Sequence, residues 1–235
     1  YIHETLSVQL DANLKEMGVS GYTIENVSQV QDKNGEWRPI DSDKDPTVIL
    51  LHYPSILEDT INYIPPRVKI EISCLSMDEP TELRPIRSLI GESFDGEDTD
   101  AESLVRTVVP SRTFLEKLFL LAEEFQKEKP RSVRMSRHLY DLEKLMDTEY
   151  GKEALSNREL YDAIVEHRKA YYALKYVNYD SHTPSTINFT IPESAMEAWQ
   201  DDYADMRRFF IYGESLEFDE LMQKMRELQE RVRIM

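Results

Sequence analysis

Two short segments of the sequence bring together side chains that can bind phosphate or transfer protons. Residues 112–118 read RTFLEKL and residues 137–142 read RHLYDL. Lysine and arginine are common cationic ligands of phosphate groups, whereas aspartate, glutamate and histidine can accept a proton. Solvated helix surfaces are usually rich in glutamate and lysine alone. The mixture of charged types beside apolar residues therefore suggests the wall of a site.

Helical spacing offers a purely structural interpretation of the same residues. Side chains four residues apart share one face of a helix, as Arg112 and Glu116, Arg134 and His138, and Arg137 and Asp141 would do. Each such pair stabilises a helix by only ~0.2–0.5 kcal/mol. Spacing alone favours amphipathic helices with surface pairs over a binding site.

Both segments fall in a part of the chain that is predicted to be mainly helical. Ser111, which follows Pro110, is suited to cap the first helix, and Pro130 would end it near Lys129. Further helices are predicted near 133–146, 157–172, 193–210 and 215–232.

The first 110 residues show mixed patterns. A helix is predicted over 2–17 and strands over 22–27, 47–53, 67–74, 82–90 and 104–109. Strands followed by helices indicate an α+β fold. We expect an α/β part over residues 1–110 and a helical domain over 111–235.

The predicted strand at 67–74 contains a candidate metal ligand. Val68, Ile70, Ile72 and Cys74 alternate with polar residues and should form its buried face, so Cys74 is expected to be a core residue. Glu71 lies on the opposite face. Taken alone it is best interpreted as an exposed strand residue, although a carboxylate in mid-strand can also bind Mg²⁺.

The composition limits the classes of function. The formal net charge of -17 argues against a general nucleic-acid binder. A basic stretch nevertheless contains Lys127, Lys129, Arg131, Arg134 and Arg137. Pairing with the many carboxylates and binding of phosphate account for this stretch equally well.

The cysteine count and the hydropathy of the sequence limit the kinds of site and the cellular location that are expected. The single cysteine excludes an intrachain disulfide and a zinc site made of cysteines. No apolar run approaches the ~20 residues that a membrane-spanning helix needs, and the start of the chain has no signal-peptide pattern. We expect a soluble cytoplasmic protein without a membrane partner.

The two helical segments resemble signatures of the AbiEii-type nucleotidyltransferase toxins. These toxins belong to bacterial toxin–antitoxin and abortive-infection systems, and their family is similar to DNA polymerase β-like nucleotidyltransferases. The strand at 67–72 (RVKIEI) resembles the strand after the metal-binding motif of the family. Residues 202–206 (DYADM) and 211–213 (IYG) resemble its C-terminal helical region. The resemblance extends from about residue 67 to the end.

The resemblance implies an activity and a set of residues. It implies transfer of a nucleotidyl group from a nucleoside triphosphate, with Mg²⁺, to an acceptor such as tRNA, and control by an antitoxin. Lys117 would meet the triphosphate, and Asp141 would orient the acceptor or act as the base. The resemblance implies that Arg112 and Arg137 are supporting phosphate contacts or partners of Glu116 and Asp141, and that Glu71 is a metal ligand. We also expect Arg134 and His138 to contact phosphate.

One departure from the family bears on activity. The Gly-Gly motif of the family and its following Asp-x-Asp pair are absent, and Asp41-Ser42-Asp43 follows a turn instead of ending a strand. Because the sequence begins with Tyr1 rather than Met, we expect that these motifs lie upstream in a parent enzyme. The 235-residue chain is then expected to be inactive by itself.

Two other interpretations remain open. The chain could be a non-catalytic binding module that contacts an antitoxin or RNA, or a plain helical scaffold. The scaffold predicts that Lys117 and Asp141 point to different surfaces. The enzyme predicts that both line one groove with Glu71.

Overall fold

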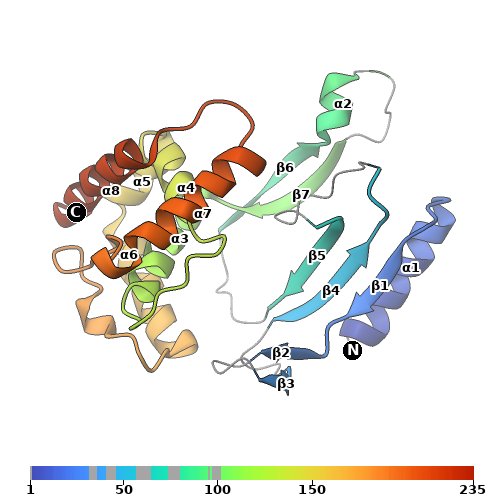
Figure 1. Cartoon of the computed structure of the whole chain (residues 1–235), viewed down its shortest axis with the longest axis horizontal. Coiled ribbons are helices and arrows are strands. Elements are labelled where there is room, and N and C mark those ends of the chain that lie inside the picture. Colours follow the sequence, from blue (N-terminus) through green and yellow to red (C-terminus); the bar gives the residue numbers. More distant parts are fainter. Residues whose placement is uncertain are drawn as a thin grey trace. The chain divides into compact units, whose positions relative to one another are not determined.

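The computed structural model describes residues 2–31, 36–40, 46–56, 65–73, 80–94, 96 and 102–235. Two compact units make up the chain, Tyr1–Ser76 and Met77–Met235. Figure 1 shows the first unit in blue to cyan and the second from green to red. The boundary expected after residue 110 differs from this division, because the strands between residues 81 and 108 group with the helices.

The first unit contains one helix and two small antiparallel sheets. A π-helical turn, Ile2–Leu6, leads into α1, Ser7–Glu16. One sheet has the order β1 (Thr23–Asn26), β4 (Thr47–His52), β5 (Arg67–Ile72), and the other pairs β2 (Gln29–Gln31) with β3 (Trp37–Pro39). The predicted helix at 2–17 corresponds to the π-helical turn and α1, and the strands predicted at 22–27 and 47–53 correspond to β1 and β4. The strand predicted at 67–74 is present as β5, which ends at Ile72.

Strand β4 supplies the core of this unit. Its residues Val48, Ile49 and Leu50 are all buried, because β4 is the central strand with a neighbour on each edge. The alternation predicted for β5 is only partly realised, since Ile70 and Ile72 are half-buried but Val68 is exposed. An edge strand has fewer neighbours to cover its apolar face. Cys74 lies outside the described residues.

The second unit begins with a hairpin of β6 (Thr81–Arg87) and β7 (Glu102–Val108). Residues 82–90 were expected to form one strand, but the strand ends at Arg87. The hydroxyl of Ser88 then accepts a hydrogen bond of 2.9 Å from the Gly91 backbone N–H and caps the short helix α2, Leu89–Ser93.

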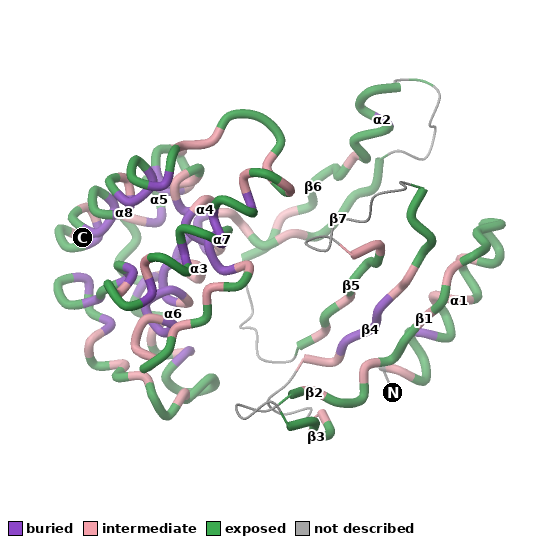
Figure 2. Tube along the Cα trace, in the orientation of Figure 1, coloured by how far each residue is buried: buried purple, intermediate pink, exposed green. Residues whose placement is uncertain are grey.

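Helices form the rest of this unit. They are α3 (Pro110–Glu124), α4 (Arg137–Met146), α5 (Glu149–Ser156), α6 (Arg158–His167) with a π-helical extension (Arg168–Tyr172), α7 (Met196–Phe209) and α8 (Phe218–Arg233). Short 3-10 turns lie at Tyr179–Ser181 and Glu193–Ala195. Helix α3 contacts α4, α5 and α6, and Figure 2 shows its buried surface in purple. No helix in the described parts of the chain is both long and apolar enough to cross a membrane.

Three helix boundaries differ from the sequence predictions. Pro110 is the first residue of α3 and Val109 precedes it as the cap, so Ser111 lies inside the helix. Helix α3 ends at Glu124 instead of near Lys129, and α4 starts at Arg137 instead of near residue 133. Helix α5 was not predicted, because its eight residues are too few to show a clear period.

Gly151 in α5 has a packing role that its helical position does not suggest. A Cβ built on Gly151 would lie 2.3 Å from the Leu145 carbonyl oxygen and 2.9 Å from the Met146 Cα. Helix propensity alone predicts that Gly151→Ala stabilises the protein. We expect the opposite, a loss of about 1–3 kcal/mol in urea unfolding, because backbone atoms would have to move. A gain in unfolding free energy would contradict the close approach.

Candidate functional site

The two predicted segments meet at a pair of oppositely charged side chains. Lys117 Nζ of α3 lies 2.6 Å from Asp141 Oδ2 of α4, and the side chains are 22% and 36% exposed. The scaffold interpretation, which placed these residues on different surfaces, is wrong on this point. Helical spacing had suggested that Asp141 pairs with Arg137 on its own helix. Asp141 instead pairs with Lys117 on the neighbouring helix.

Apolar neighbours fix this pair in place. Leu118, next to Lys117, is fully buried, as are Leu139 and Leu142 on either side of Asp141. Burial of these side chains holds α3 against α4. The charged residues therefore emerge side by side at the rim of the core, where solvent or a ligand can reach them.

His138 lies beside this pair in an unusual environment. Its side chain is nearly buried, and its Nδ1 has no hydrogen-bond partner within the described part of the protein. Burial, and then the charges of Lys117 and Arg137, lower the pKa of His138 to about 4, against a smaller opposing effect of Asp141. The imidazole is therefore neutral near pH 7 and adds no positive charge to the site.

The lowered pKa of His138 predicts a dependence of stability on pH. Between pH 6.5 and about 4 the unfolded chain binds a proton at this residue and the folded chain does not. The contribution of His138 to the free energy of unfolding is therefore fully present above pH 6.5. It is lost as the pH falls toward 4, by about 3 kcal/mol in total. We expect His138→Gln to show a shallower decline in urea unfolding over this range. An unchanged slope would refute the prediction.

Arg112 is part of a buried ionic network and not an open phosphate contact. Its Nη2 lies 2.6 Å from Glu116 Oε1, and the side chain is 2% exposed. Arg168 contacts the other oxygen of Glu116 and also Glu123, with Nε–Oε1 and Nη2–Oε2 distances of 2.7 and 2.5 Å. These contacts join α3 to the π-helical turn after α6. The partnership of Arg112 with Glu116 was expected, whereas the roles of Arg168 and Glu123 were missed.

The start of α4 is held by a residue of α7. Both oxygens of Asp202 accept hydrogen bonds, from the Arg134 backbone N–H at 2.5 Å and from the Ser136 N–H and hydroxyl at 2.9 and 2.5 Å. Arg134 has a left-handed backbone with φ of 59°, which costs an L-residue about 1–2 kcal/mol. Asp202 compensates this cost and explains why α4 begins at Arg137.

The pairing of the basic stretch with carboxylates is confirmed in part, and phosphate binding by it stays a prediction. Glu124 accepts from the Arg131 backbone N–H and guanidinium, both at 2.7 Å, and from Lys127 at 2.8 Å. Arg137 is exposed, and its side chain forms no ion pair within the described residues. One arginine thus pairs with a carboxylate, and another stays available beside Asp141.

The candidate metal ligand, Glu71, belongs to the first unit, whereas Lys117 and Asp141 belong to the second. Glu71 of β5 pairs with Lys69 at 2.7 Å, and both side chains are about half exposed. No group of three or more His, Cys, Asp or Glu side chains able to hold a metal is present among the described residues. A magnesium site that includes Glu71 and a groove shared by Glu71, Lys117 and Asp141 therefore stay predictions.

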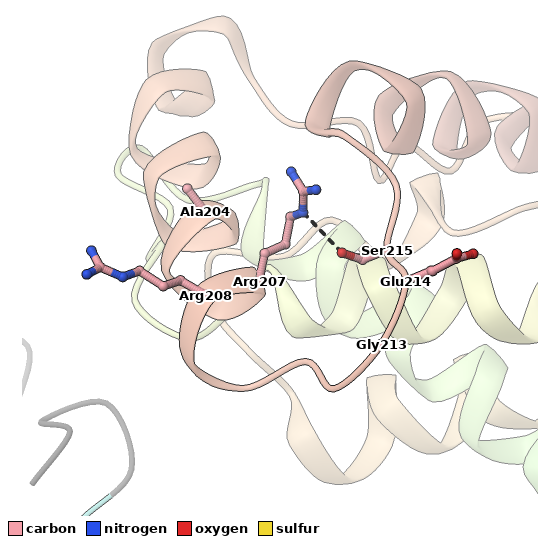
Figure 3. A pocket seen from close by; sticks show the side chains of 6 residues that line it. All are labelled: Ala204, Arg207, Arg208, Gly213, Glu214 and Ser215. Carbon is pink, nitrogen blue, oxygen red and sulfur yellow. Dashed lines mark hydrogen bonds between the residues drawn. The ribbon is translucent and has the colours of Figure 1, made fainter. Parts of the chain in front are cut away.

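An open pocket of about 580 Å³ lies near the end of α7 (Figure 3). It is lined by Ala204, Arg207, Arg208, Gly213, Glu214 and Ser215. Arg207 donates to Ser215 at 3.0 Å and to Glu217 at 2.6 Å, so its charge is already neutralised. None of the predicted site residues lines this pocket.

Comparison with known proteins identifies one match. The model of a family described as nucleotidyl transferase AbiEii toxin, type IV TA system, matches residues 3–224. That range includes both helical segments and Asp202. Searches of curated proteins and of solved structures returned no match.

Proposed function

Because the chain belongs to the AbiEii nucleotidyl transferase toxin family of type IV toxin–antitoxin systems, we propose that it carries the phosphate-binding and acceptor-binding residues of a nucleotidyl transfer. The observation that supports this most is the contact between Lys117 and Asp141 at a partly exposed position. A cation beside a carboxylate can contact both reactants, with Lys117 at the triphosphate and Asp141 at the acceptor. The proposed setting is the cytoplasm, with an antitoxin as the partner protein.

In the proposed reaction, a hydroxyl oxygen of the acceptor attacks the α-phosphorus of a nucleoside triphosphate. The bond from that phosphorus to the bridging oxygen breaks, and pyrophosphate leaves with the bonding electrons. Lys117 would stabilise charge on the phosphates, as a compact cation with three donors can. Asp141 would orient the hydroxyl or take its proton, and Arg137 would add a phosphate contact. We propose the acceptor end of tRNA as the acceptor.

Magnesium is proposed on family grounds only. Mg²⁺ supplies charge neutralisation on the phosphates when it is bound, and Glu71 would be one of its ligands. Glu71 is paired with Lys69 at 2.7 Å. Because the Gly-Gly and Asp-x-Asp motifs that the resemblance calls for are absent from the sequence, we propose that the 235-residue chain transfers no nucleotides by itself.

The test uses nucleoside triphosphates labelled at the α-phosphate, with tRNA and Mg²⁺. The complete gene product that contains this chain is expected to label tRNA, and its Asp141→Asn variant is expected to label at most about 1% as fast. The 235-residue chain alone is expected to give no product. Full activity of the Asp141→Asn variant would refute the proposed role of this residue.

A binding module without catalysis is the second candidate. The contact between Lys117 and Asp141, in which each side chain already offsets the charge of the other, is the observation that favours it. This candidate predicts that the complete gene product labels no RNA but still binds its antitoxin. It also predicts that Lys117→Ala and Asp141→Asn leave growth inhibition unchanged.

A further inference from the structure

Two segments of the helical unit are basic, whereas the chain as a whole is acidic. Residues 125–137 and 167–179 contain eight of the 28 Lys and Arg residues of the protein and one of its 45 Asp and Glu residues. The second segment reads HRKAYYALKYVNY and holds four of the 13 tyrosines. Basic and aromatic residues interleaved in this way are typical of surfaces that bind single-stranded nucleic acid.

The two segments lie side by side although they are far apart in the sequence. The Asn178 backbone N–H donates to Gln126 Oε1 at 2.7 Å, and Lys127 Nζ lies 5.3 Å from the centre of the Tyr176 ring. We call the half-buried Lys127 and the exposed Arg131, Tyr171, Tyr172, Lys175 and Tyr176 the tyrosine surface.

The tyrosine rings are accessible and adjoin one another. Tyr171 is 66% exposed and Tyr176 is 44% exposed. The His167 ring lies 4.6 Å from that of Tyr171 and 6.1 Å from that of Tyr172, so these rings form one group. Burial, and then the charges of carboxylates that include Glu123 of α3, raise the pKa of both Tyr172 and Tyr176, so both tyrosines lie near Glu123. Such rings offer faces on which bases can stack.

The charges of this surface suit a polyanion. Lys175 is exposed and forms no ion pair with any residue that the structure describes. The buried carboxylate of Glu124 is shared by Lys127 and Arg131, so two cations offset one anion. Burial raises the pKa of Tyr176 to about 12, and its ring is therefore uncharged at neutral pH and does not repel phosphate.

The tyrosine surface continues to the Lys117–Asp141 pair. After the larger effect of burial, Arg131 is among the charges that shift the pKa of both Tyr176 and His138, so its guanidinium lies near both residues. Arg137, exposed beside His138, extends the row of cations toward Asp141. A strand lying on the tyrosines would therefore meet cations on its way to the pair.

We propose that single-stranded RNA binds across the tyrosine surface, with bases stacked on Tyr171 and Tyr176 and phosphates against Lys175, Arg131 and Arg137. The further proposal that the end of this RNA strand points toward Lys117 and Asp141 rests on the proposed function, because it assumes that RNA is the acceptor. Binding to the surface does not require catalysis and can be measured separately.

The test measures the affinity of the full chain for a fluorescein-labelled single-stranded RNA of about 12 nucleotides, by anisotropy. Tyr171→Ala and Tyr176→Ala are each expected to weaken binding roughly tenfold, which is the range for loss of one stacked base. Tyr171→Phe and Tyr176→Phe, which keep the rings, should bind as the wild type does. Lys175→Ala should weaken binding and reduce its salt dependence.

Matched controls and contrary outcomes are available. Tyr212→Ala and Lys152→Ala remove exposed residues of the same types elsewhere and should leave affinity unchanged. The proposal is overturned if the chain binds no RNA, if the alanine variants bind as tightly as the wild type, or if duplex RNA binds equally well. Loss of antitoxin binding with intact RNA binding in these variants would instead identify a protein interface.

Failure of the proposed function gives a different pattern. If Lys117→Ala keeps full toxicity while the tyrosine variants lose RNA affinity, the catalytic proposal fails and the tyrosine surface stands. If Lys117→Ala loses toxicity and the tyrosine variants bind RNA normally, the surface proposal fails alone.

Discussion

Lys117→Ala is expected to reduce nucleotidyl transfer by the complete gene product at least ~100-fold and to abolish its growth inhibition. Loss of one group that stabilises developing charge typically costs 10²–10³ in rate, as an order of magnitude. The rate of label transfer and the growth of cells that express the variant both measure this effect. Unchanged toxicity would exclude the proposed role of Lys117.

Stability measurements separate this effect from misfolding. The Lys117–Asp141 pair is partly exposed, and such pairs contribute about 0–1 kcal/mol, so the variant should unfold close to the wild type in urea. Lys144→Ala is a matched control, because Lys144 is an exposed lysine of α4 that pairs with Glu143 at 3.1 Å. This control is expected to remain active and toxic.

Glu123→Ala is expected to produce the largest loss of stability, about 3–5 kcal/mol. Glu123 and Arg168 are nearly buried, with 5% and 6% of their side chains exposed, and removal of the carboxylate leaves Arg168 poorly compensated in the core. Glu116 contacts Arg168 but already pairs with Arg112. Urea unfolding measures the loss.

A double variant distinguishes the pair from simple loss of packing. Replacing Glu123 with leucine and Arg168 with methionine removes both charges and keeps similar volumes. Such replacements of buried ion pairs are often neutral or stabilising, so the double variant should recover most of the lost stability. Glu153→Ala, an exposed change on α5, should have almost no effect. A double variant as unstable as Glu123→Ala would contradict the ionic explanation.

Sequence patterns predicted the elements of the site better than its contacts. The helices that carry Lys117 and Asp141 follow from apolar periodicity, and the resemblance of the two segments singled out both residues. Spacing within one helix, however, predicted a pair between Arg137 and Asp141. The cross-helix pair could not be predicted in this way, because it depends on how Leu118, Leu139 and Leu142 bring α3 and α4 together.

The start of α4 could not be predicted from the neighbouring residues either, because it also depends on a contact with a distant part of the chain. Arg134 adopts a left-handed backbone conformation. Glycine at this position would have indicated such a conformation in the sequence, whereas arginine does not. The conformation is fixed by Asp202, which is distant in the sequence. The role of Arg168 was missed for the same reason, because its partners Glu116 and Glu123 lie on another element.

The dependence of α4 on Asp202 also sets an order of assembly during translation. Asp202 leaves the ribosome after Asp141, with roughly 60 residues between them, which takes about 3–12 s at about 5–20 residues per second. Until then the carboxylate that holds Arg134 and Ser136 is missing from the exposed nascent chain. The segment that presents Asp141 is therefore fixed late in synthesis, so a growing or prematurely ended chain lacks the finished site.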